Sequence, residues 1–215
     1  MNKKPIKIIF FDLDGTLVNS IPPAIVAIQA MMNELGYPPK SVADINKYVG
    51  FGENPLVAGA IGSQDKDKIE QAKNLYFELY KIKLKEIPLY PHIKEFLEAV
   101  KGKIMIIVSN KGDALIHEIL ENHGIACYFS QVLGGDSSLC LKPDPCAILD
   151  LLKKHQISPK EALMIGDMTV DIKTGQNAGI LTCAVTYGFD DREKLEELKP
   201  DFLVDDLLEL LPHIS

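Results

Sequence analysis

Short apolar runs alternate with amphipathic stretches through the second half of the chain, and this pattern predicts an α/β fold. Runs without polar interruptions indicate buried strands, whereas apolar residues spaced three and four apart indicate helices. The strands are expected at residues 7–11, 103–108, 128–133, 162–165, 181–185 and 202–204. The helices are expected at residues 91–101, 113–123, 145–155, 171–178 and 207–211. Continuously apolar strands separated by helices predict a doubly wound, Rossmann-like parallel sheet with both faces covered.

The segment between the first and second predicted strands has a different pattern. Its apolar residues recur at helical spacing, and no stretch from Val18 to Lys85 reads as a strong strand. Helices are expected at residues 21–35, 41–48, 55–60 and 65–85. We therefore predict a helical cap domain over residues 18–87, inserted into a core domain of residues 1–17 and 88–215, with hinges near Val18 and Pro88.

Composition and charge narrow the possible partners. The 215 residues are 47% hydrophobic and carry a formal net charge of -7, which does not favour nucleic acid or an anionic membrane surface as a partner. No apolar run approaches the roughly 20 residues of a membrane span. We expect a cytoplasmic protein, monomeric or homodimeric, with a small-molecule partner. The four cysteines form no Cys-x-x-Cys pair, so reduced structural cysteines are expected and a zinc site is not.

Candidate chemistry begins where the first strand ends, at Asp12-Leu-Asp14-Gly15-Thr16. Two carboxylates in one small volume are unfavourable unless a cation lies between them or one holds a proton. Mg²⁺, which prefers oxygen ligands, is the natural cation. Taken alone, the same residues also fit an ordinary β-turn with Asp and Gly as turn formers.

Other polar residues follow later strands and distinguish these two interpretations. Ser109 and Asn110 follow the second strand, Asp167 follows the strand at 162–165 with Asp171 four residues on, and Lys142 precedes the helix at 145–155. Each signal alone fits a turn, a helix cap or a solvated side chain. Because ligands bind at the carboxyl ends of parallel strands, we expect all of them to gather around Asp12.

This set of groups suits phosphoryl transfer. Asp12 could attack phosphorus and form an aspartyl-phosphate, while Asp14 protonates the leaving alkoxide and later takes a proton from water. Mg²⁺ would be held by Asp12, Asp14 and Asp167, with Asp171 as a further ligand or as support for the others. The residues predicted to bind the phosphate oxygens are Thr16, Ser109, Asn110 and Lys142.

The four segments also carry a family resemblance. Asp12-Leu-Asp14-Gly-Thr16, Ser109-Asn110, Lys142-Pro143 and Gly166-Asp167-Met-Thr-Val-Asp171 occur in the order of the motifs of the haloacid dehalogenase superfamily of aspartate-nucleophile phosphatases, which the chain resembles over essentially its whole length. This resemblance implies Mg²⁺-dependent phosphomonoester hydrolysis through an aspartyl-phosphate. Within the superfamily the chain looks most like phosphoglycolate phosphatases.

The predicted cap departs from relatives, and the substrate depends on it. Asn46-Lys47 stands where an arginine is often found, and we expect Lys47, with Gly50 and Phe51, to contact the non-phosphoryl end of the substrate. A phosphosugar mutase, a pyrophosphatase and a non-catalytic phosphometabolite-binding protein are the alternative functions. Dehalogenation is disfavoured because expelling a halide needs no acid at Asp14.

Overall fold

The molecule is built on one parallel sheet. The structure, a computed structural model, describes residues 5–138 and 140–214, so positions 1–4, 139 and 215 of the predicted core lie outside it. In the described residues six strands pair in the order β3-β2-β1-β4-β5-β6, and every pair is parallel. They are β1 (Ile8–Phe11), β2 (Ile104–Val108), β3 (Gln131–Leu133), β4 (Ala162–Gly166), β5 (Leu181–Val185) and β6 (Phe202–Val204). The predicted α/β fold is confirmed.

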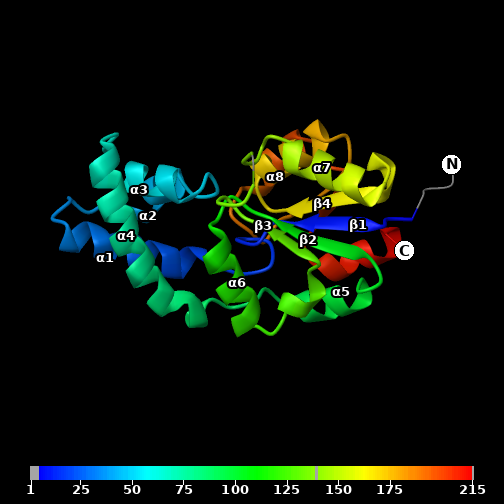
Figure 1. Cartoon of the computed structure of the whole chain (residues 1–215), viewed down its shortest axis with the longest axis horizontal. Coiled ribbons are helices and arrows are strands. Elements are labelled where there is room, and N and C mark those ends of the chain that lie inside the picture. The colour runs from blue at the N-terminus through cyan, green and yellow to red at the C-terminus, as the bar shows by residue number, and fades with distance from the viewer. Residues whose placement is uncertain (1–4, 139, 215) are drawn as a thin grey trace.

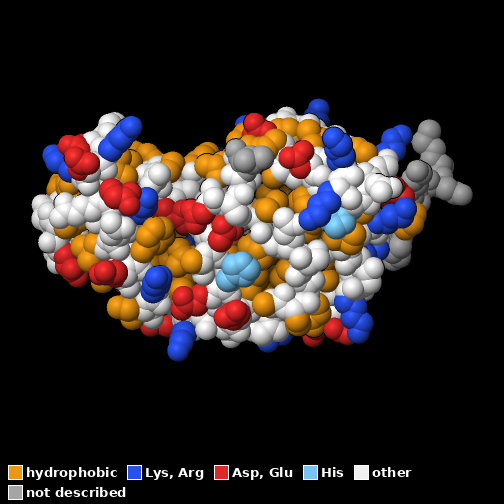
Figure 2. All heavy atoms as spheres, viewed as in Figure 1, with side chains coloured by type: hydrophobic (Ala, Val, Ile, Leu, Met, Phe, Trp, Pro, Cys, Tyr) orange, Lys and Arg blue, Asp and Glu red, His pale blue; other side chains and the backbone are white. Residues whose placement is uncertain are grey.

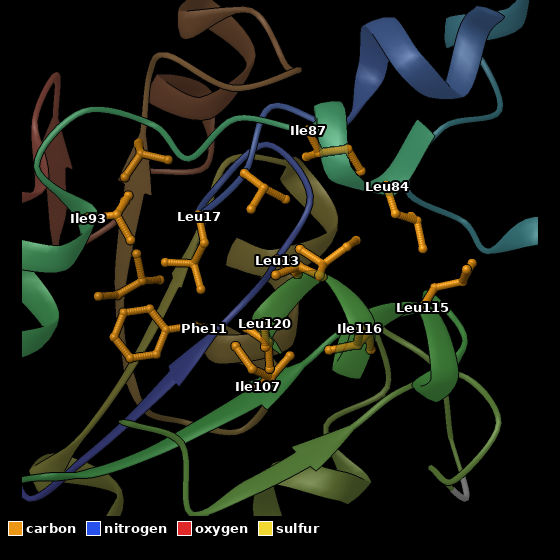
Figure 3. Packing of buried hydrophobic residues seen from close by; sticks show 14 of the residues in the cluster. Phe11, Leu13, Leu17, Leu84, Ile87, Ile93, Ile107, Leu115, Ile116 and Leu120 are labelled. Atoms are coloured by element: carbon orange, nitrogen blue, oxygen red, sulfur yellow. The ribbon is translucent and has the colours of Figure 1, made fainter. Parts of the chain in front are cut away.

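Helices cover both faces of the sheet (Figure 1). They are α5 (Ile93–Ala99), α6 (Asp113–Asn122), α7 (Cys146–His155), α8 (Thr169–Asn177) and α9 (Arg192–Glu197). Side chains of β1 alternate between two cores: Ile9 and Phe11 pack in the cluster that includes residues of α5 and α6, and Ile8 and Phe10 pack in the cluster that includes residues of α7. Burying one such side chain stabilises the fold by about 1.5–3 kcal/mol. Figure 3 shows Phe11 among its neighbours.

A second group of helices stands beyond the end of the sheet (Figure 1). It contains α1 (Ile21–Glu34), α2 (Val42–Asn46), α3 (Glu53–Ile61) and α4 (Lys66–Lys83), followed by the 3₁₀ helix η1 (Leu84–Glu86). Tyr76 and Tyr80 of α4 are buried and stack with ring centroids 5.4 Å apart. We propose that α1–α4, the helical block, form the inserted domain predicted for residues 18–87.

The chain enters and leaves the helical block through one two-stranded stem. Val18 pairs antiparallel with Leu89, the Asn19 amide donates to the Pro88 carbonyl at 2.9 Å, and the Tyr90 amide donates to the Leu17 carbonyl at 3.0 Å. These contacts lie at the two positions where the sequence predicts hinges.

Some local features differ from the predictions. Helix α9 is absent from the sequence prediction, and the last helix is the 3₁₀ helix η4 (Leu207–His213). Cys140 and Cys146 form a disulfide, with Cα atoms 6.3 Å apart. The expectation that all the cysteines are reduced is therefore wrong for this pair, whose loop brings two residues six positions apart within bridging distance.

The exterior is mixed in character. On the face shown in Figure 2, basic and acidic side chains are interspersed. No helix among residues 5–138 and 140–214 is both long enough and apolar enough to cross a membrane.

Candidate active site

Asp12 lies directly after the central strand. The strand β1 is fully buried and pairs with β2 and β4 on either side. The Asp12 amide donates to the Ile165 carbonyl at 2.9 Å, which extends the ladder by one residue. The carboxylate, 5% exposed, is therefore held at the carboxyl edge of the sheet by a rigid element on each side.

The turn after Asp12 requires glycine at Gly15. Gly15 has φ +86°, and a Cβ there would lie 2.1 Å from Asp167 Oδ2, so any side chain would displace Asp167. The next residue also contacts Asp167: Thr16 Oγ1 donates to Asp167 Oδ1 at 2.8 Å. The turn thus brings the first and fourth motifs together. The Thr16 hydroxyl, predicted to bind phosphate, is engaged by Asp167.

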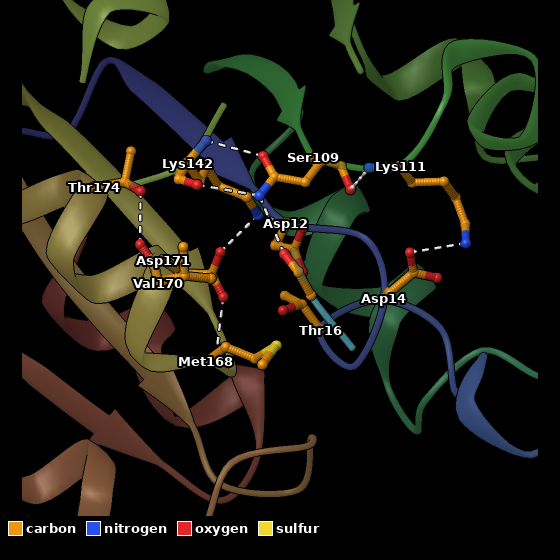
Figure 4. A network of polar contacts seen from close by, with 12 residues as sticks. Asp12, Asp14, Thr16, Ser109, Lys111, Lys142, Met168, Val170, Asp171 and Thr174 are labelled. Carbon is orange, nitrogen blue, oxygen red and sulfur yellow. Dashed lines mark hydrogen bonds and ion pairs between the residues drawn. The ribbon is translucent and has the colours of Figure 1, made fainter. Parts of the chain in front are cut away.

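Lys142 links the third motif to the first and the fourth. Its Nζ lies 2.6 Å from Asp12 Oδ1 and 2.6 Å from Asp171 Oδ1, as Figure 4 shows. Burial alone lowers the pKa of Lys142, but the Asp12 and Asp171 carboxylates raise it above its usual value, so the ammonium remains charged. Asp171 also accepts from the Met168 amide at 3.0 Å, which fixes its carboxylate at the start of α8.

Ser109 and Asn110 follow β2 and position the Lys142 loop. Asn110 Oδ1 accepts from the Lys142 amide at 2.9 Å, and Asn110 Nδ2 donates to the Lys142 carbonyl at 3.2 Å. The same Nδ2 donates to the Gly50 carbonyl of the helical block at 3.1 Å. Ser109 is buried and lines the pocket beside Asp12. Asn110 therefore joins the second motif, the third motif and the helical block.

Three buried carboxylates gather here with ligand atoms within 4.8 Å of one another: Asp12, Asp167 and Asp171. Burial raises the pKa of Asp12 to about 7 and raises the pKa of Asp167 well above its ordinary value. Lys142 alone does not balance three carboxylates. A hard divalent cation fits this oxygen donor set, since it would compensate the remaining charge. A Cβ on Gly188 would lie 2.2 Å from Asp167 Cβ, so the backbone encloses Asp167 closely.

Asp14 points away from this group, toward Lys111 (Figure 4). Lys111 Nζ lies 3.0 Å from Asp14 Oδ2, while Asp14 Oδ1 is buried without a hydrogen-bond partner among the described residues. The structure thus separates the two carboxylates of the first motif. Asp12 faces Lys142 and the acidic group, and Asp14 faces a second lysine across the pocket.

Comparisons with known proteins identify the family of the chain. The family model for haloacid dehalogenase-like hydrolases matches residues 9–185. The chain belongs to this hydrolase family. It is 39% identical to a phosphoglycolate phosphatase of Vibrio parahaemolyticus over 100% of this chain and 99% of the relative. The corresponding identity to a phosphoglycolate phosphatase of Vibrio cholerae is 39%, over 97% and 96% of the two chains.

Solved structures show the same similarity for this family member. A crystal structure described as a predicted phosphoglycolate phosphatase from Haemophilus somnus superposes with TM-score 0.92 at 32% identity, covering 98% of both chains. A haloacid dehalogenase-like hydrolase from Streptococcus pneumoniae superposes with TM-score 0.84 at 30% identity, covering 98% of this chain and 99% of that one.

Of the three residues predicted to contact the non-phosphoryl end of the substrate, Gly50 lines the pocket of this hydrolase, whereas Lys47 and Phe51 do not. A Cβ at Gly50 would lie 2.4 Å from Met168 Sδ, so a side chain here would clash with Met168. Lys47 instead pairs with Asp44 at 2.7 Å on the surface, with its side chain 67% exposed. Phe51 is also exposed and is not among the lining residues.

The pocket is also lined by residues for which the sequence predicts no role in the site, among them Glu53, Tyr76 and Lys111. Glu53 Oε1 accepts from the Gly112 amide at 2.9 Å, a second contact between the helical block and the loop after β2. Lys111 directly follows Ser109-Asn110, and this adjacency is the signal that could have identified it.

Proposed function

We propose that this hydrolase is a Mg²⁺-dependent phosphomonoesterase that acts on phosphoglycolate through an aspartyl-phosphate intermediate. The observation that carries the proposal is the convergence of four separate chain segments on Asp12, whose carboxylate contacts Lys142 at 2.6 Å. Residues of the helical block and of the core line the pocket above it together. Such a pocket suits a small phosphorylated metabolite.

Asp12 is the nucleophile in this proposal. Its carboxylate attacks phosphorus, the phosphorus–oxygen bond to the alcohol breaks, and the alkoxide leaves. Lys142 beside Asp12 offsets the repulsion between the carboxylate and the phosphoryl oxygens. Ser109 and Asn110 line the same pocket and are proposed to bind the phosphoryl oxygens, Asn110 through its backbone amide because its side chain already contacts Lys142 and Gly50.

Asp14 is the proton carrier. In its protonated form it gives a proton to the departing alkoxide, and its carboxylate then takes a proton from the water that attacks the aspartyl-phosphate. Inorganic phosphate leaves and Asp12 is regenerated. The unpartnered Asp14 Oδ1, buried at the pocket, is the atom suited to this transfer.

Asp12 and Asp167 would hold Mg²⁺, and Asp171 would either join them or anchor Lys142. When bound, Mg²⁺ supplies positive charge to the phosphoryl oxygens and orients them for in-line attack. Thr16 and the Phe189 amide fix the Asp167 carboxylate by donating to its two oxygens, each at 2.8 Å.

The names of the relatives support phosphoglycolate as the substrate. A phosphate-release assay with Mg²⁺ should show turnover of phosphoglycolate above glucose phosphates and pyrophosphate, which also separates phosphatase from mutase and pyrophosphatase activity. Asp12→Asn should abolish turnover, and Asp14→Asn should lower it while leaving the nucleophile in place. Activity that persists in Asp12→Asn, or pure protein inactive on every phosphomonoester tested, would refute the proposal.

A further inference from the structure

The pocket contains a second, largely buried cation, and the phosphoryl chemistry leaves it unassigned. Among the described residues that line the pocket, Lys111 and Lys142 are the basic ones. Lys142 is engaged by two carboxylates next to the nucleophile. Lys111 has a side chain 10% exposed and lies on the other side of Asp14, as Figure 4 shows.

The surroundings of Lys111 hold its ammonium at the boundary between the sheet and the helical block. Its Nζ donates to Tyr80 Oη of α4 at 3.4 Å and lies 4.8 Å from the centroid of the Tyr80 ring. An ammonium has three N–H donors. Asp14 Oδ2 and Tyr80 Oη are the partners of this ammonium among the described residues, which leaves the third donor for a ligand.

The place of Lys111 relative to Asp14 matches the geometry of an acidic leaving group. Asp14 must contact the oxygen that bridges phosphorus and carbon, because that oxygen receives the proton. In phosphoglycolate the carboxylate carbon lies two covalent bonds beyond that oxygen. An ammonium 3.0 Å from Asp14 Oδ2 is therefore within reach of this carboxylate.

We propose that Lys111 is a specificity-determining residue that binds an anionic group on the leaving alcohol, the carboxylate in the case of phosphoglycolate. This inference rests on the proposed phosphatase function and deepens it. It assigns recognition of the substrate's acidic end to the loop after β2, in the core, instead of to Lys47 of the helical block, whose side chain is directed to solvent and Asp44.

A charge-assisted hydrogen bond in a buried site gives a large effect on specificity. Removing such a bond costs enough to lower kcat/KM roughly 10- to 100-fold. The loss should be confined to substrates that carry the anionic group, since a neutral alcohol has nothing to offer the ammonium. The ratio of kcat/KM between matched acidic and neutral substrates is therefore the quantity that reports the role of Lys111.

The experiment compares phosphoglycolate with ethyl phosphate, in which a methyl group replaces the carboxylate. Wild-type protein should prefer phosphoglycolate. Lys111→Met should lower kcat/KM for phosphoglycolate roughly 10- to 100-fold and change that for ethyl phosphate less than about threefold. Lys111→Arg should restore part of the preference. Lys81→Met, which removes an exposed lysine from α4, is the matched control and should leave both values unchanged.

A third substrate separates recognition from an indirect effect through Asp14. p-Nitrophenyl phosphate has a good leaving group that needs little acid catalysis. If Lys111 served only to position Asp14, Lys111→Met would slow phosphoglycolate and ethyl phosphate equally and spare p-nitrophenyl phosphate, and the inference would be overturned. Equal rates of wild-type protein on phosphoglycolate and ethyl phosphate would overturn it as well, while the phosphatase function would stand.

A measurement on wild-type protein tests the same point without any variant. 3-Phosphonopropionate, in which CH₂ replaces the bridging oxygen of phosphoglycolate, should inhibit hydrolysis of p-nitrophenyl phosphate competitively, and roughly 10- to 100-fold more strongly than propylphosphonate, which lacks the carboxylate. Equal inhibition by the two phosphonates contradicts the inference. Failure of the protein to hydrolyse any of the three phosphate esters with Mg²⁺ present refutes the proposed function itself.

Discussion

Replacing Asp12 by Asn is predicted to stabilise the metal-free protein even though it removes the nucleophile. The carboxyl is buried, and its removal from water raises its pKa from 3.8 to about 7, with Lys142 opposing this rise and Asp171 and Asp14 adding to it. The folded protein therefore binds this proton more tightly than the unfolded chain. The resulting stabilisation is complete below the unfolded pKa and is lost as pH rises through about 7.

The size of the effect follows from this pKa. At about 1.4 kcal/mol for each pKa unit, ionised Asp12 lowers the free energy of unfolding by up to about 4 kcal/mol above pH 7. Asn keeps an oxygen that can accept from Lys142 but does not ionise. For a chain of this length 1 kcal/mol corresponds to about 2–4 °C, so the variant should melt roughly 8–16 °C higher than wild type at about pH 8.

Thermal unfolding in EDTA at about pH 5 and about pH 8 measures this difference. The advantage of Asp12→Asn should grow with pH, and added Mg²⁺ should narrow it, since the proposed function has wild type hold the ion through Asp12. Asp150→Asn, which removes an exposed carboxylate from α7, controls for the change in net charge. A variant that is less stable than wild type at the higher pH, or an offset that does not change with pH, would show that the reasoning is incorrect.

Metal binding, one surface ion pair and the cysteine pair give the remaining predictions. Mg²⁺ at about 100 times its Kd should raise the wild-type Tm by roughly 5–11 °C in a thermal-shift titration, and Asp167→Asn should lose this increase. Asp206 raises the pKa of His92 through a hydrogen bond. Protonated His92 therefore stabilises the folded protein at about pH 6, and this stabilisation is lost as the pH rises. The amount by which wild type melts above His92→Gln should shrink between about pH 6 and about pH 8.5. Mass spectrometry should find Cys140 and Cys146 alkylated only after reduction.

The sequence was sufficient to predict the sheet and most of its helices. Strand β1 is recognisable because four consecutive apolar residues are followed at once by Asp12. Helix α9 was missed because it spans six residues, of which Leu195 is the buried one, so no apolar period develops. The cysteine pair was missed because the path of the loop between two elements, not residue spacing, decides whether two thiols meet.

In the site, prediction worked for residues whose place follows from strand ends. Asp12, Asp167 and Asp171 meet because parallel strands end at one edge. Lys47 was predicted near the substrate from its closeness in sequence to Gly50, but its side chain leaves the helix toward Asp44. Lys111 was passed over because the direction of a side chain after a strand depends on the turn that follows. Directions of side chains in loops are tertiary properties.

The two-stranded stem between Val18 and Leu89 also bears on how such proteins diversify. A block whose two ends leave the sheet at one point can be exchanged as a unit, with one crossover near Val18 and one near Leu89, because the core has to match only one short hairpin base. Lys111 lies on the sheet side of that junction. A transplanted helical block would therefore meet a core that already carries Lys111, the cation proposed to bind the acidic end of the substrate.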